Sequence, residues 1–185
     1  FTGPKSLHVI ETNGNTQDIA ADRIIIATGS VPSMPPIPGL AENKNCIDST
    51  GALTLEQMPA SMVIIGGGVI GIELACTYAL FGTKVTVVEM MPRLMPVMDY
   101  ELTQMAQKIM EDAGIEFLLE TQVLGFEAGD VGAKVVIKDK SGAESKLEAE
   151  KVLVAVGRRS NVATLNLGAA GIVTERGHVV TNDHM

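Results

Sequence analysis

One segment of the chain, residues 61–89, restricts the possible folds more than any other. It contains a short apolar run at 62–65, a glycine-rich turn, an apolar helix that Gly82 ends, and a second apolar run at 84–89. Parallel strands need a long crossover connection, and a helix usually supplies it. We therefore expect a βαβ unit in this segment.

A further helix and strand extend this unit. Asp99 is a suitable helix N-cap, Gly114 is a suitable helix end, and residues 115–119 are typical of the next strand. The whole pattern predicts an α/β fold with a Rossmann-like parallel sheet of βαβαβ connectivity. Four apolar residues are expected to share one face of the helix: Leu102, Met105, Ile109 and Met110.

The chain also contains an internal repeat, because residues 7–33 align without a gap with residues 135–161. Each copy is typical of strand, turn, strand and buried strand, and the first copy ends in the apolar run 24–29. Alternation at 134–138 predicts a half-buried antiparallel edge, and the unbroken run 152–156 predicts a strand covered on both faces. We expect the second copy to form a three-stranded antiparallel β-meander.

The domain organisation follows from where the repeats lie. A complete α/β unit precedes the second copy, whereas none precedes the first, so the chain is interpreted as a fragment. Four prolines at 31–39 predict an extended connector. We expect residues 1–58 to be the remnant of a first domain with this connector, 59–158 to be a nucleotide-binding domain, and 159–185 to return toward the truncated first domain.

Composition argues against several classes of partner. Acidic residues number 22 and basic residues 14, the net charge is -8 and there is no Trp, so nucleic acid is not an expected partner. The longest apolar stretch, 62–72, is too short and interrupted to span a bilayer, and no membrane partner is expected. Cys46 and Cys76 lack metal or redox spacing and are expected to be small structural residues. No metal site is predicted, and three histidines are expected at the surface: His8, His178 and His184.

The glycine-rich turn has the G-x-G-x-x-G pattern between a strand and a helix. Gly66 would permit the tight turn, Gly68 would let the backbone approach a pyrophosphate, and Gly71 would let the helix pack closely on the strand. Unpaired amides at a helix start carry partial positive charge, so they can hold phosphate oxygens without a basic side chain. The pattern therefore predicts a dinucleotide site.

Glu89 ends the strand after this helix, twenty-three residues beyond Gly66. A carboxylate there would accept hydrogen bonds from the hydroxyls of an adenosine ribose, which favours NAD. The 2′-phosphate of NADP would meet repulsion of a few kcal/mol, and Arg93 is the nearby base that could counter it. FAD in this unit and an ordinary glycine turn are the alternatives.

Glu73 lies early in the helix among apolar residues. Burying it would cost several kcal/mol without a partner. It is interpreted either as a charge near the helix N-terminus or as a carboxylate facing the nicotinamide end of the cofactor. Four methionines are expected to pack as flexible apolar residues: Met90, Met91, Met95 and Met98.

Residues 49–53, Pro59 and the run 63–74 closely resemble dihydrolipoamide dehydrogenase, a family of flavoproteins with two dinucleotide-binding domains. The segments 24–30 and 152–161 are similar to the two buried strands of this class that end in Ala-Thr-Gly or Ala-Val-Gly. The resemblance covers essentially the whole chain. It implies that the first repeat contains remnant strands of a truncated FAD domain.

Position by position, the resemblance implies two sets of cofactor contacts and no catalytic residue in this segment. The flavin glycine loop, the redox disulfide, the second flavin-contacting Gly-Asp and the carboxy-terminal His-Pro have no counterpart here, and Ser160 replaces a usual proline. FAD would contact Thr28, Gly29 and Ser30. NAD would contact Gly66, Gly67, Gly68, Val69, Ile70, Gly71, Ile72, Glu73, Glu89, Val123 and Gly157.

The resemblance also implies a function for the parent protein. It would oxidise dihydrolipoyl groups and pass hydride through FAD to NAD, as a homodimer within 2-oxo acid dehydrogenase or glycine cleavage complexes. It would work in a bacterial cytoplasm or, alternatively, in a mitochondrial matrix, and the fragment alone is expected to be inactive. Another FAD-dependent disulfide reductase or NADH oxidase, and a non-catalytic nucleotide-sensing module, are the alternatives.

Overall fold

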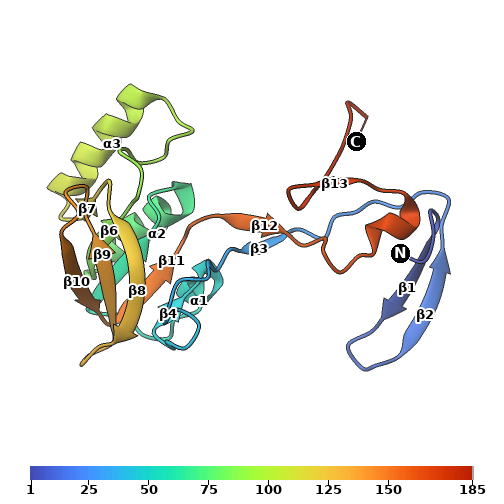
Figure 1. Cartoon of the computed structure of the whole chain (residues 1–185), viewed down its shortest axis with the longest axis horizontal. Helices are drawn as coiled ribbons and strands as arrows, with labels where there is room; N and C mark the ends of the chain where they lie inside the picture. Colours follow the sequence, from blue (N-terminus) through green and yellow to red (C-terminus); the bar gives the residue numbers. More distant parts are fainter. Residues whose placement is uncertain (185) are drawn as a thin grey trace. The chain divides into compact units, whose positions relative to one another are not determined.

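The computed structural model describes residues 1–184 and divides the chain into two compact units (Figure 1). One unit consists of Phe1–Val31 and Arg158–Met185, and the other consists of Pro32–Gly157. No helix among the described residues is long and apolar enough to cross a membrane.

The larger unit is built on a five-stranded parallel sheet with the order β4-β11-β5-β6-β7. The predicted parallel α/β sheet is therefore confirmed, and the second strand of the βαβ unit lies beside the first. The strands are β4 (Cys46–Ile47), β5 (Ser61–Ile65), β6 (Lys84–Val88), β7 (Glu116–Leu118) and β11 (Lys151–Val154); the helices are α1 (Ser49–Leu53), α2 (Val69–Leu80) and α3 (Tyr100–Asp112).

Two hydrophobic cores lie on opposite faces of this sheet. Ile64 of β5 packs in a core with residues of α2 and α3, whereas its neighbours Val63 and Ile65 pack in a second core with residues of the β-meander. Both faces of the central strands are thus covered, which explains why their sequences are unbroken apolar runs. Residues 152–154 are at most 1% exposed, as predicted.

The β-meander consists of β8 (Gln122–Ala128), β9 (Ala133–Lys138) and β10 (Glu144–Ala149), in the order β10-β9-β8. β9 has the predicted half-buried alternation. Its predicted edge position is wrong, because β9 lies between the other two strands and pairs with both.

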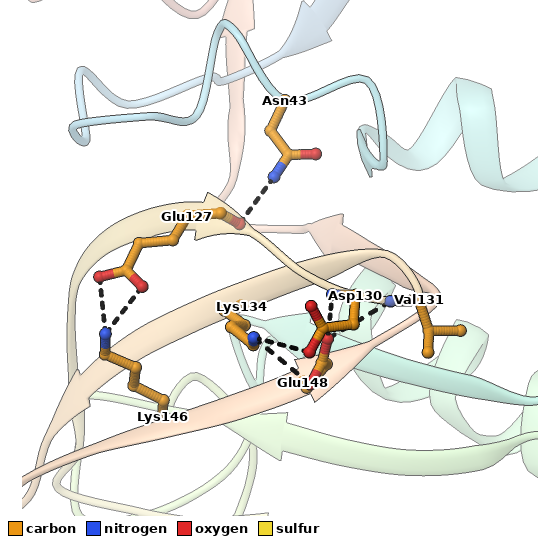
Figure 2. A network of polar contacts seen from close by, with 7 residues as sticks. All are labelled: Asn43, Glu127, Asp130, Val131, Lys134, Lys146 and Glu148. Atoms are coloured by element: carbon orange, nitrogen blue, oxygen red, sulfur yellow. Dashed lines mark hydrogen bonds and ion pairs between the residues drawn. The ribbon is translucent and has the colours of Figure 1, made fainter.

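Ion pairs join the outer faces of these strands (Figure 2). Lys146 of β10 pairs with Glu127 of β8 at 2.7 Å, and Glu148 accepts a 2.6 Å hydrogen bond from the Asp130 amide in the turn. Lys134 contacts the carboxylates of Asp130 and Glu148 at 3.2 and 3.9 Å. Each such exposed pair contributes at most about 1 kcal/mol.

The apolar face of α3 is not the predicted one. Leu102, Met105 and Ile109 are 65, 64 and 66% exposed, whereas Met110 is buried with Thr103. Residues 103, 106 and 110 form the inward face. A threonine and an alanine therefore pack against the core, where the sequence predicted larger apolar side chains. The N-cap prediction is confirmed, because Asp99 accepts hydrogen bonds from the amides of residues 101 and 102.

The proline-rich connector packs on the β-meander. The Phe126 amide donates a 2.8 Å hydrogen bond to the Pro38 carbonyl, and Leu40 is only 4% exposed. Gly39 is required here, because a Cβ atom would lie 2.1 Å from the Phe126 carbonyl oxygen. The larger unit accordingly begins at Pro32 and includes β4 and α1, whereas the sequence placed its start at residue 59.

The smaller unit contains a hairpin, β1 (Ser6–Ile10) with β2 (Thr16–Ala20), in antiparallel register. The predicted buried strand at 24–29 is wrong, because these residues form no strand and Ile25 is 90% exposed. A strand needs a neighbouring strand that pairs with its backbone groups, and no strand among the described residues pairs with residues 24–29. The remaining elements are β3 (Ser30–Pro32), which pairs with β12 (Arg158–Ser160), η1 (Leu167–Ala170), β13 (Thr174–Glu175) and β14 (His178–Val179).

Candidate nucleotide-binding site

The glycine turn lies at the carboxyl edge of the parallel sheet. The Gly66 amide donates to the Val88 carbonyl at 2.9 Å, and the Ala155 amide donates to the Ile65 carbonyl at 2.8 Å. These bonds bring the ends of β5, β6 and β11 together. This is the edge at which open α/β sheets bind their ligands.

Two of the three pattern glycines are required by the protein itself. Gly66 has φ +107°, and a Cβ atom there would lie 2.6 Å from the Ala155 carbonyl oxygen. A Cβ atom on Gly71 would lie 2.0 Å from the Gly66 carbonyl oxygen. Both steric roles predicted from the sequence therefore have a structural cause: the tight turn and the close approach of the helix.

Gly68 differs from these two glycines. A Cβ atom there would meet no protein atom within 4 Å, and the residue has an ordinary φ of -74°. Neither strain nor crowding within the chain therefore requires glycine at this position. A ligand that approaches the backbone closely would supply the missing reason.

The start of α2 is suited to an anion. Gly68 is its N-cap, no side chain caps it, and its first turn contains no acidic residue. The first amides of a helix lack intrahelical partners and carry partial positive charge. The first backbone amides of α2 are therefore available as hydrogen-bond donors beside the open space at Gly68, as they are in phosphate-binding helices.

Glu89 links the glycine turn to the next loop. Its Oε2 accepts a 2.6 Å hydrogen bond from the Gly67 amide, its Oε1 accepts one of 2.7 Å from the Met91 amide, and the residue is only 9% exposed. A carboxylate offers about four acceptor positions, so these two bonds leave acceptor capacity for ligand hydroxyls.

A second contact braces the same turn, and sequence reasoning missed it. The Met95 amide donates to the Gly67 carbonyl at 2.9 Å, and Leu94, 1% exposed, lies where a Gly67 Cβ would contact its Cδ2 at 2.6 Å. Met95 has φ 43°, a conformation that no sequence pattern signals for methionine. Met90, Met91 and Met98 are 70, 46 and 47% exposed, so apolar packing was correctly expected only for Met95.

Arg93, the base that could counter a 2′-phosphate, is engaged elsewhere. Its guanidinium donates a hydrogen bond to the Pro96 carbonyl and lies 5.8 Å from the ring centroid of Tyr100. The arginine therefore has interactions that it would have to give up before it could pair with a phosphate.

Glu73 is exposed on α2, so its carboxylate does not need the partner that burial would have demanded. Its neighbour Ile72 is buried in the core. The Cys76 prediction is also wrong, because this residue is exposed, whereas Cys46 is half-buried beside the second core. Helix α2 places residues 73 and 76 on its outward side.

The remaining predicted residues lie in different places. Gly157, with φ +120°, follows by two positions the Ala155 carbonyl that lies against Gly66. Val123 lies on β8, two residues after Thr121, whose amide donates to the Glu89 carbonyl at 3.0 Å.

The residues predicted to contact FAD lie in and beside β3. Thr28, Gly29 and Ser30 are exposed, and the Gly29 carbonyl accepts a 3.0 Å hydrogen bond from the Asn161 amide. The three histidines are exposed as predicted, and the described residues contain no group of three or more potential metal ligands.

A parallel sheet, a glycine turn at its carboxyl edge and an uncapped helix define a Rossmann-type α/β protein. The family model of pyridine nucleotide-disulphide oxidoreductases matches residues 1–185. The chain belongs to this family.

Known relatives agree with this assignment. The chain is 34% identical to mitochondrial dihydrolipoyl dehydrogenase of Pisum sativum over 186 residues, which are 99% of the chain and 37% of the relative. It is 37% identical to dihydrolipoyl dehydrogenase of Chlorobaculum parvum over 184 residues, 99% of the chain and 39% of the relative. The chain thus spans well under half the length of these relatives.

Solved structures of flavoprotein disulfide reductases share the fold. The HOCl-induced flavoprotein disulfide reductase RclA from Escherichia coli, solved as a Cu(II) complex, superposes with a TM-score of 0.87 at 32% identity. The match covers 98% of this chain and 40% of that one.

Proposed function

We propose that this chain is the NAD-binding part of a flavoprotein similar to dihydrolipoyl dehydrogenase. The parent protein oxidises dihydrolipoyl groups and passes the electrons through FAD, as hydride, to NAD. The main support is the space beside Gly68 at the start of an uncapped helix. Of the three glycines in the G-x-G-x-x-G pattern, Gly68 is the one whose added Cβ would contact no protein atom within 4 Å. Family membership and the dihydrolipoyl dehydrogenase relatives support the reaction.

The residues of the turn divide the work of holding the cofactor. The amides at the start of α2 hold the pyrophosphate, with Val69 and Ile70 beginning the helix there. The carboxylate of Glu89 accepts the ribose hydroxyls while it fixes the Gly67 amide. Glu73, exposed one turn along α2, faces the nicotinamide end, and Gly157 lines the site. The bound nicotinamide supplies the hydride chemistry.

The flavin contacts form a separate part of the proposal. Thr28, Gly29 and Ser30 touch FAD in the parent, and the chain alone turns over no substrate. The parent forms a homodimer, serves a 2-oxo acid dehydrogenase or glycine cleavage complex, and works in a bacterial cytoplasm or a mitochondrial matrix. Relatives of both bacterial and mitochondrial origin support either location.

A second candidate is another FAD-dependent disulfide reductase of the same family. The superposition on RclA, with a TM-score of 0.87, favours it. The nucleotide-binding site would be the same in both, since the two candidates differ in what reduces the flavin.

A glycine-to-alanine pair tests the proposal. Gly68→Ala should leave the stability of the chain nearly unchanged, because its Cβ meets no protein atom within 4 Å, yet weaken NADH binding at least about tenfold by blocking the pyrophosphate. Gly125→Ala is the matched control, because Gly125 lies outside the glycine turn and its Cβ would lie 3.5 Å from the nearest protein atom, an ordinary contact distance. Urea unfolding and calorimetric NADH titration are the measurements. Unchanged NADH affinity in Gly68→Ala contradicts the proposed site.

A further inference from the structure

The peptide group between Gly67 and Gly68 is held by a contact from outside the glycine turn. The Met95 amide donates a 2.9 Å hydrogen bond to the Gly67 carbonyl. This peptide bond is trans, so its N–H group points opposite to its carbonyl group. Because the carbonyl points toward Met95, the amide of Gly68 points away from Met95. The position of the Met95 amide therefore sets the direction of the Gly68 amide.

The Gly68 amide is the donor that the turn leaves available. It makes no hydrogen bond within residues 1–184, whereas the Gly67 amide donates to Oε2 of Glu89 at 2.6 Å. The two successive peptide groups of the turn are thus each fixed by one contact, the first by a carboxylate and the second by Met95. The available amide lies beside the open space at Gly68, where an added Cβ would meet no protein atom within 4 Å.

Met95 directs its amide from a strained conformation. Its φ is 43°, a value that few residues other than glycine adopt. The next residue is Pro96, and a residue before proline prefers an extended conformation with negative φ. Such strain persists only where the surrounding structure enforces it, and strained residues cluster at functional sites.

Contacts on both sides of Met95 enforce this conformation. Leu94 is 1% and Met95 is 8% exposed, and both side chains pack in the core that contains residues of α2. The Met95 carbonyl accepts a 2.9 Å hydrogen bond from the Met98 amide, which closes a turn. At the start of the same loop, the Met91 amide donates to Oε1 of Glu89 at 2.7 Å. One loop, residues 90–98, thus contacts both the glycine turn and the carboxylate at position 89.

We propose that Met95 is a positioning residue for the dinucleotide, because its amide orients the Gly68 amide toward the pyrophosphate. The inference rests on the proposed NAD site and adds to it a residue outside the glycine pattern. A change of φ at Met95 rotates the peptide group that carries the Met95 amide. Hydrogen bonds weaken steeply when the donor is misaligned, and those to charged acceptors are the strong ones. The affinity for the pyrophosphate therefore depends on the backbone conformation of Met95.

Isomeric substitutions at position 95 test this inference in the whole chain. Met95→Ile introduces a β-branched side chain that disfavours a positive φ, whereas Met95→Leu has the same atoms without that branch and is the matched control. We expect Met95→Ile to bind NADH at least about fivefold more weakly than Met95→Leu, and Met95→Leu to match wild type within about twofold. Calorimetric titration measures the affinities, and amide NMR spectra show that each variant is folded.

A glycine variant separates positioning from packing. Met95→Gly adopts a φ of 43° without strain and keeps the amide, but it loses a buried side chain. We expect a lower midpoint of urea unfolding and an NADH affinity within about threefold of wild type. In NMR spectra the Gly68 amide should shift downfield on addition of NADH in wild type, Met95→Leu and Met95→Gly, and should shift less in Met95→Ile.

The outcomes distinguish this inference from the proposed function. When wild type binds NADH, equal affinities of the Ile and Leu variants overturn the role of Met95 and leave the NAD site in place. An NADH affinity of Met95→Gly that falls at least about fivefold does the same, and this variant decides alone if Met95→Ile does not fold. Wild-type protein without saturable NADH binding overturns both the inference and the proposed function.

Discussion

Replacing Glu89 by Gln should remove the discrimination between NADH and NADPH. The 2′-phosphate of NADPH carries nearly two negative charges, and one pair of unit charges about 4 Å apart interacts by about 4 kcal/mol at an effective dielectric near 20. Salt screens part of this energy. We therefore expect the chain with Glu89 to bind NADH on the order of 100-fold more tightly than NADPH.

The variant changes both affinities. Gln keeps one acceptor oxygen but loses the charge, so NADH should bind about 10-fold more weakly while NADPH loses its repulsion. The ratio of the two dissociation constants should fall to within about tenfold. The structure also predicts a loss of about 1–3 kcal/mol in the free energy of unfolding. The two carboxylate oxygens of Glu89 accept hydrogen bonds from the Gly67 and Met91 amides, whereas Gln has one oxygen and can keep only one of these bonds.

Calorimetric titration of both nucleotides into both proteins measures the ratio, and urea unfolding measures the stability. Glu120→Gln is the control for charge alone, because Glu120 pairs with Lys140 at 3.1 Å and its amide donates to the Met91 carbonyl of the same loop. This control should keep the preference for NADH. Wild-type protein that binds NADPH as tightly as NADH, or an unchanged ratio in Glu89→Gln, refutes the reasoning.

Further predictions concern packing and thiol chemistry. Gly71→Ala should cost several kcal/mol in urea unfolding, since its Cβ would lie 2.0 Å from a carbonyl oxygen, and a cost below 1 kcal/mol would contradict this close approach. Met110→Ala should cost about 2–5 kcal/mol, because Met110 is the buried methionine of α3; an unfolding midpoint like that of wild type would refute the inward assignment. Burial raises the pKa of Cys46 to about 11, so iodoacetamide at pH 8 should alkylate the exposed Cys76 first, as mass spectrometry of the peptides would show, and faster labelling of Cys46 would contradict it.

The parts of the fold that local sequence determines were predicted well. Alternation or continuity of apolar residues identified β9 and β11, and Asp99 and Gly114 marked the ends of α3. Each of these signals depends on a few adjacent residues and on the backbone conformations that they permit. The same holds for the positive φ of Gly66, which the tight turn requires, whereas the crowding at Gly66 comes from the distant Ala155 carbonyl.

Features that depend on distant neighbours were not predictable in this way. Leu102, Met105 and Ile109 have the spacing of a buried face, but the sheet packs against the face that contains Thr103 and Met110. Periodicity identifies faces of a helix that contain apolar residues. When two faces of one helix contain apolar residues, periodicity does not say which of them packs against the core. The brace at Met95 was missed because a positive φ in methionine has no sequence signal.

The two copies of the repeat show how far tertiary context decides between structures of similar sequences. In the second copy the apolar run becomes β11, which pairs on one side with β4 and on the other with β5, and its residues 152–154 are at most 1% exposed. In the first copy the matching run forms no strand, and Ile25 is 90% exposed. The hairpins that precede the two runs form in both copies, because a hairpin satisfies its backbone within one short segment. A central parallel strand has no such local partner, so the apolar run alone is insufficient. The same dependence explains the nucleotide site: its turn forms only where β5, β6 and β11 end side by side, which makes the pattern of glycines meaningful in one place along this chain.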